Sequence, residues 1–171
     1  MEPLFTNSCL LTKEVYKEAY LAITRTRRIL VVILSAIILV SSIFEIYWTD
    51  DVLFYFFAGF FVLFAVYYFV FFPRRAVNIT YQRNQEVYHE ETSSTVKFYE
   101  DRIETKSIPS NAEATLRYDQ IVRIKATRQL YIFIIRQKML IILDKGKFEN
   151  INLIEFEHFM KEKAVKAKVM L

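Results

Sequence analysis

The sequence contains very little glycine, proline or cysteine: its 171 residues include two glycines, three prolines and one cysteine, Cys9. One cysteine cannot form a disulfide within the chain, which excludes the disulfide-rich secreted scaffolds. Two glycines are too few for a glycine-rich phosphate loop, and no nucleophile elbow or kinase signature occurs. We therefore expect no enzymatic activity, no catalytic residues and no cofactor.

Lysine and arginine are missing between residues 29 and 73. Two apolar runs, residues 29–48 and 52–72, fill this interval. At about 1.5 Å of rise per residue, each run makes a helix of about 30 Å, which is the thickness of the hydrocarbon core of a bilayer. Only residues 49–51 separate the runs. The sequence therefore predicts an antiparallel hairpin of two transmembrane helices.

The flanking charges predict the orientation of this hairpin. Arg27 and Arg28 precede the first run, Arg74 and Arg75 follow the second, and the connecting loop carries only acidic charge. Because cytoplasmic flanks are enriched in lysine and arginine, both termini are expected in the cytoplasm. We expect a multi-pass protein of the bacterial inner, or plasma, membrane.

The first predicted domain, residues 1–28, is a cytoplasmic amphipathic helix. The helix is expected to begin at Thr12, whose hydroxyl can cap it. Its apolar side chains recur at helical spacing; they are Val15, Tyr16, Ala19, Tyr20 and Ile23. Three interpretations stay open: the helix lies along the inner membrane face, docks on the following domain, or is a solvated lead-in.

Residues 74–171 change to short runs with strand-like alternation, after the transmembrane domain at 29–73. Seven strands are predicted, at residues 86–90, 95–99, 102–107, 112–118, 121–127, 130–136 and 138–143. The run at 130–136 is apolar almost throughout and should be a more buried strand than the run at 121–127. A final helix is capped by Asn152. Its apolar stripe would plug the open end of a small barrel; the stripe is Leu153, Phe156, Met160 and Ala164, with Phe159 beside it.

Three segments of this region resemble the YcxB-like family of bacterial membrane proteins. They are FYEDRIETKS at 98–107, LRYDQIVRIKATRQLYIFI at 116–134 and IILDKGKFENINLIEFEHFMKEK at 141–163. The resemblance implies a two-span hairpin followed by a C-terminal domain similar to pleckstrin-homology (PH) folds, hence a seven-stranded α+β barrel or roll capped by one helix. It supplies no catalytic or ligand-binding residues.

Few other residues are candidates for chemistry. His89 and His158 lie on different elements without a third ligand at suitable spacing, so no metal site is expected. Glu45, the one charge within a span, either reaches the outer headgroups or marks an ion or partner site. Cys9 is interpreted as a spectator thiol, with palmitoylation near the membrane as the alternative.

From Arg74 onward, basic residues outnumber acidic residues by 18 to 13. A predicted basic patch on consecutive strands comprises Arg123, Lys125, Arg128, Arg136 and Lys138, extended by Lys145 and Lys147 at a strand end. Such a patch can bind anionic lipid headgroups; the alternative is a solvated sheet face. Nucleic acid is not expected, because neither a recognition helix nor aromatic platforms for bases are present.

These patterns predict a non-enzymatic, membrane-anchored interaction protein. In this hypothesis the cytoplasmic PH-like domain binds a protein partner, another copy of the chain in a homo-oligomer, or anionic headgroups. The alternative is an accessory subunit of a larger membrane transport or enzyme complex, in which the hairpin packs on a membrane protein partner.

Overall fold

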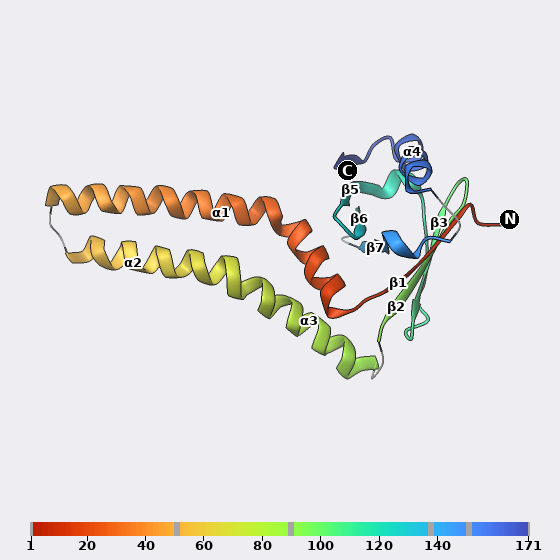
Figure 1. Cartoon of the computed structure of the whole chain (residues 1–171), viewed down its shortest axis with the longest axis horizontal. Helices are drawn as coiled ribbons and strands as arrows, with labels where there is room; N and C mark the ends of the chain where they lie inside the picture. Colours follow the sequence, from red (N-terminus) through yellow and green to blue (C-terminus); the bar gives the residue numbers. More distant parts are fainter. Residues whose placement is uncertain (1, 50–51, 89–90, 137–138, 150–151, 171) are drawn as a thin grey trace. The chain divides into compact units, whose positions relative to one another are not determined.

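The computed structural model describes residues 2–49, 52–88, 91–136, 139–149 and 152–170 (Figure 1). It divides into two compact units. We call the first, Met1–Ala19 with Thr80–Leu171, the sheet unit, and the second, Tyr20–Ile79, the helical unit. The N-terminal residues thus share a unit with the C-terminal part of the chain, a division that differs from the three predicted domains.

The helical unit contains both predicted apolar runs. Helix α1 (Lys13–Thr49) holds the first, and α2 (Val52–Val66), the π-helix η1 (Tyr67–Phe71) and α3 (Phe72–Tyr88) hold the second. Both continuous helices are long and apolar enough to cross a membrane, judged by length and composition. The predicted turn at Asp50 and Asp51 lies outside the described residues.

Helix α1 begins where the sequence predicted. The backbone N–H of Val15 donates to Oγ1 of Thr12 over 3.3 Å, so Thr12 caps the helix. The helix then continues without interruption to Thr49, so residues 13–28 are not a separate element. The chain before Thr12 is not helical either, because residues 5–10 form a strand.

Small residues in the two apolar runs differ in their surroundings. Ser42 is buried, with its hydroxyl donating to the carbonyl of Ile38 over 2.9 Å. Ser41 is exposed instead. A Cβ atom placed on Gly59 would meet nothing within 4 Å. Gly59 is therefore not a point of close helix approach.

The sheet unit contains two four-stranded sheets in the described residues rather than a closed seven-stranded barrel. Sheet A has the order β1-β2-β3-β4, all antiparallel. Sheet B has the order β7-β6-β5-β8, with β8 parallel to β5. The strands are β1 (Phe5–Leu10), β2 (Ser93–Phe98), β3 (Ile103–Ile108), β4 (Glu113–Leu116), β5 (Ile121–Ala126), β6 (Leu130–Ile135), β7 (Leu140–Asp144) and β8 (Lys168–Met170).

Six of the seven predicted strands correspond to β2–β7, but the first does not. The predicted strand at 86–90 is wrong, because α3 continues to Tyr88 and residues 89–90 lie outside the described part. Two strands, β1 and β8, were not predicted. Strand β8 lies beyond the last helix, α4 (Leu153–Lys163), in a lysine-rich stretch.

Strand β1 links the two sheets through a side chain. Its side chains alternate, with Phe5, Asn7 and Cys9 buried. The Nδ2 group of Asn7 donates to the carbonyl of Asp144 over 2.7 Å, and its Oδ1 accepts from the N–H of Asp144 over 3.2 Å. Asn7 therefore bonds the end of β7 as the backbone of a neighbouring strand would.

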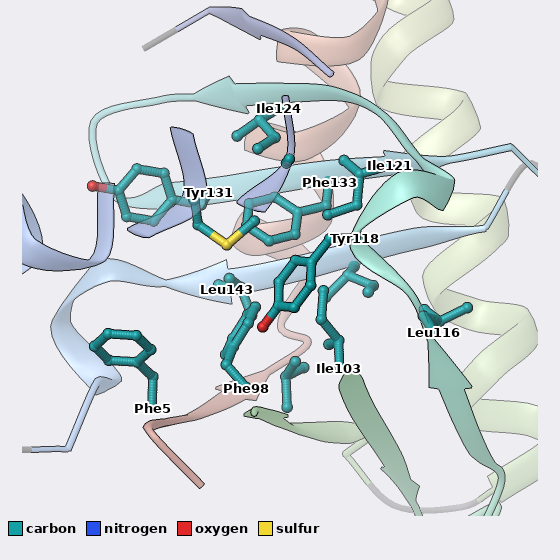
Figure 2. Close-up of a cluster of buried hydrophobic side chains, with 14 of the residues drawn as sticks. Phe5, Phe98, Ile103, Leu116, Tyr118, Ile121, Ile124, Tyr131, Phe133 and Leu143 are labelled. Carbon is teal, nitrogen blue, oxygen red and sulfur yellow. The ribbon is translucent and has the colours of Figure 1, made fainter. Parts of the chain in front are cut away.

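The core lies between the sheets and is closed by α4 (Figure 2). Phe156 of α4 is buried with its ring centroid 5.1 Å from that of Phe98 and 4.6 Å from that of Phe148. Asn152 caps the helix by accepting from the N–H of Ile154 over 3.1 Å. The predicted apolar stripe is confirmed, since Phe156, Met160 and Ala164 belong to the core.

A β-bulge in β5 changes which residues face the core. The register of β5 on β6 shifts between Ile121 and Arg123. As a result, Ile121 and Ile124 are both buried, whereas Val122 is 43% exposed. The extra residue of the bulge brings Ile121 and Ile124 onto one face.

We expect Asn7→Ala to lower the free energy of unfolding by about 2 kcal/mol, because two buried backbone groups of Asp144 lose their partners. Pulse proteolysis of the full chain in detergent, across a urea series, measures this change. The matched control is Ser8→Ala on the same strand. Because the side chain of Ser8 is exposed, this substitution should change the free energy of unfolding by less than about 0.5 kcal/mol. Equal effects of the two substitutions would contradict the role given to Asn7.

Candidate interaction site

The residues of the predicted basic patch are dispersed in the structure. Arg123 and Lys125 lie on β5, where Lys125 is only 6% exposed. Arg128 precedes β6 and Arg136 follows it, so an entire six-residue strand separates these two exposed side chains. At about 3.3 Å per residue this is close to 20 Å. Lys138 lies outside the described residues.

Three of the basic residues do gather at one end of sheet B. Lys145 and Lys147 lie in the short 3₁₀ helix η3 (Lys145–Lys147), and Arg128 lies in the turn between β5 and β6. The backbone N–H of Lys145 donates to the carbonyl of Gln129 over 2.8 Å, which joins the two turns. We call Arg128, Lys145 and Lys147 the basic end.

The ammonium group of Lys145 contacts other residues of the sheet unit. Its Nζ donates to the carbonyl of Thr127 over 2.7 Å and lies 4.5 Å from the ring centroid of Tyr131. Arg128 and Lys147 are exposed. The basic end thus offers two exposed charges to an anionic partner, with Lys145 holding its two turns together.

The arginines that flank the apolar runs differ in their surroundings. Arg27, Arg74 and Arg75 are exposed. Arg28 is partly buried, and its Nη2 donates to the carbonyl of Leu21 over 3.2 Å. Its guanidinium carbon lies 5.3 Å from the ring centroid of Phe69. This contact joins the two helical segments within the helical unit.

Cys9 is held inside the sheet unit. It is 1% exposed on β1, and burial, together with the charge of Asp144, raises the pKa of its thiol to about 11. A protonated, covered thiol is a poor nucleophile, so this position favours the spectator role over acylation. Of the other candidates, Glu45 and His158 are exposed and His89 lies outside the described residues.

Sheet A presents a hollow outer face of about 460 Å³ that sequence reasoning missed. Its lining includes Thr95 and Lys97 of β2, Glu104 and Lys106 of β3, and Glu113 and Thr115 of β4. The Nζ of Lys106 lies 2.8 Å from Oε1 of Glu113. Both signs of charge alternate across this face. The alternation in each strand was visible in the sequence, but the strand order that assembles the face was not.

A second cavity, of about 160 Å³, lies between the inner face of sheet A and β7. Ser94, Val96 and Thr105 line one side, and Leu140 and Ile142 line the other. None of these residues forms an acid–base pair or a nucleophile with a base. Both hollows are surfaces suited to contacts with a partner.

Comparison with known families adds one finding. Residues 98–160 match the family model described as YcxB-like protein. The predicted resemblance is confirmed for this region. The YcxB-like region extends from the end of β2 to α4, and so includes the basic end, strands β3 and β4 of sheet A and strands β5, β6 and β7 of sheet B. No curated protein and no solved structure matches the chain.

We expect the native thiol of Cys9 to react with iodoacetamide at pH 8 at least about a hundredfold more slowly than in urea. Burial keeps it protonated, since a pKa raised to about 11 leaves little thiolate at that pH. Mass spectrometry of timed samples measures the rate. As a control, Val165→Cys in a Cys9→Ala background should react quickly, because Val165 is 80% exposed. Rapid alkylation of native Cys9 would contradict this structure of β1.

If the basic end contacts anionic headgroups, replacing Arg128 and Lys147 by glutamine should weaken binding of short-chain phosphatidylglycerol to the full chain in neutral detergent. A loss of about thirtyfold is expected at low salt, since each of the two cations contributes about 1 kcal/mol. Thermophoresis measures the affinity. The control pair Arg136→Gln with Lys166→Gln removes equal charge elsewhere, and an equal loss there would show a general charge effect.

Proposed function

We propose that this chain is a non-enzymatic, membrane-anchored interaction protein. The two apolar helices anchor it as a hairpin with both termini in the cytoplasm of a bacterial cell. The YcxB-like region, in a sheet unit related to PH folds, binds a protein partner, another copy of the chain or anionic headgroups.

The observation that carries the proposal is the exposure of large apolar side chains along both helices. Trp48 is 71% exposed, Phe56 73% and Leu63 72%. In the most apolar stretch of the second helix no side chain is buried. Water-soluble proteins do not leave contiguous apolar surface of this extent uncovered, because the free-energy cost grows with the exposed area. A bilayer covers such helices directly.

The pairing of strands in sheet A supports an even number of crossings of the bilayer by the chain. Strand β1 precedes α1, and its antiparallel partner β2 follows α3. Because these strands pair with each other, the chain must leave and return to the same side of a bilayer. A single crossing is incompatible with this pairing. The arginine-rich flanks, Arg27 and Arg28 before and Arg74 and Arg75 after, then favour the cytoplasmic side.

The sheet unit supports recognition rather than catalysis. It presents the basic end, the alternating charges of the outer face of sheet A and a small cavity beside β7. Antiparallel sheets around one apolar core, closed by a C-terminal helix, are also what the proposed relationship to PH folds requires. A larger membrane partner would cover the same helix faces that lipid covers, which is the accessory-subunit alternative.

Cysteine labelling tests the anchoring and the orientation. In a Cys9→Ala background, Trp48→Cys should react with a membrane-impermeant maleimide on intact bacterial cells, because it lies at the outer end of α1. Val165→Cys should react only after the cells are permeabilised. Gel-shift detection gives the labelled fraction.

Labelling of Val165→Cys on intact cells would overturn the proposed orientation. Recovery of the full chain in the soluble fraction after lysis would overturn the anchoring itself.

A further inference from the structure

Strand β4 is the outer edge of sheet A, and half of its backbone groups have no strand to bond. The N–H of Ser107 donates to the carbonyl of Ala112 over 2.9 Å, which sets the phase of the β3–β4 ladder. In an antiparallel ladder, bonded and non-bonded pairs alternate. The backbones of Ala114 and Leu116 therefore bond to β3, and those of Glu113 and Thr115 point away from it.

Both residues at this edge are exposed to solvent. The side chain of Glu113 is 67% exposed, and Thr115 is also exposed. In the described part of the chain, the outward N–H and C=O groups of Glu113 and Thr115 accept or donate no backbone hydrogen bond outside the sheet. The edge thus offers two donors and two acceptors at the repeat of a β-strand. Such groups fit another extended backbone.

We propose that β4 pairs antiparallel with β4 of a second copy of this chain, about a two-fold axis at Ala114, to form a continuous eight-stranded sheet. This inference rests on the proposed function, and it names the copy and the surface through which the sheet unit associates. In this register Glu113 of one copy lies opposite Thr115 of the other. All four outward groups of each copy then find partners, with four backbone hydrogen bonds across the axis.

The side chains of β4 are self-complementary in this register. Ala114 lies opposite Ala114 of the second copy. The two side chains that come closest at the axis are therefore small. Ala112 lies opposite Leu116 on the same face. On the other face, the two diagonal neighbours of Glu113 in the second copy are Arg117 and Glu113, and the long side chain of Arg117 can reach the Glu113 carboxylate.

The charge at this edge therefore distinguishes a second copy from an arbitrary strand. Arg117 is 77% exposed and lies 3.4 Å from Asp119, so it is accessible from the edge. A charged residue on an edge strand ordinarily prevents pairing. Here the opposite charge follows Glu113 at the spacing that a two-fold axis at Ala114 requires. The charges of Glu113 and Arg117 thus match a second copy in this register.

Four backbone hydrogen bonds and two ion pairs are too few to hold two soluble molecules together at low concentration. Membrane anchoring changes this balance. Confinement to one membrane raises the effective concentration of the second copy and fixes the side from which it approaches. We therefore expect the dimer in membranes and its dissociation when the chain is diluted in detergent.

Disulfide trapping tests the register. In a Cys9→Ala background, the full chain carrying Ala114→Cys is oxidised in native membranes with copper phenanthroline and resolved on a non-reducing gel. A non-hydrogen-bonded antiparallel pair brings the two Cα atoms to about 4.5 Å, which suits a disulfide. We expect a dimer from Ala114→Cys and about tenfold less from Thr115→Cys or Lys97→Cys, because those side chains do not meet across the axis.

A charge exchange tests the contact across the axis. Arg117→Glu, added to Ala114→Cys, should lower the dimer yield by about tenfold. In that variant the carboxylate of Glu113 in each copy faces a second carboxylate, at position 117 of the other copy. Adding Glu113→Lys to that variant should restore the yield. A merely structural role of Arg117 would not be rescued in this way.

Two outcomes would overturn the inference. One is a yield from Lys97→Cys equal to that from Ala114→Cys, which would indicate random collision. The other is a monomer, or a disulfide adduct whose mass is not that of two copies, from Ala114→Cys. Maleimide labelling at Trp48→Cys and Val165→Cys reports separately on anchoring, so a failed dimer with correct labelling leaves the proposed function standing.

Discussion

The bond between Asn7 and Asp144 is the interaction on which the sheet unit depends. One amide side chain satisfies both outward backbone groups of Asp144 and joins sheet A to sheet B. Beside it, Phe5 adds its ring to the cluster around Phe156, with centroids 5.5 Å apart. Residues before the helical unit thus complete a core whose remaining side chains come from after it. The apolar helices are an insertion between two neighbouring strands.

The sequence predicted the elements whose local pattern determines them. The hairpin of β2 and β3 follows from alternation on both sides of an acidic turn, and α4 follows from a cap and an apolar stripe. Strand β1 was missed because its inward positions are Phe5, Asn7 and Cys9. A buried asparagine is acceptable only when distant partners satisfy it, and local periodicity does not contain those partners.

The dispersed basic patch has a related cause. Arg123 and Lys125 were predicted to belong to one basic patch, with a solvated sheet face as the alternative. Lys125 is opposite Ile132 on β6, and Ile132 is fully buried, so this face of sheet B is covered as well. The unbroken apolar run of β6 already indicated two covered faces. Because β5 pairs with β6, two covered faces for β6 imply covered faces for β5 too, which would have predicted the burial of Lys125.

The position of β1 also governs the order of synthesis. This strand leaves the ribosome before the apolar helices, yet its neighbour β2 emerges only after both helices have been translated. Until then Phe5 and Cys9 have no sheet to join. Folding of the sheet unit must therefore wait until both apolar helices have been synthesised, and a nascent chain stalled between the helices would leave its leading segment open to proteases.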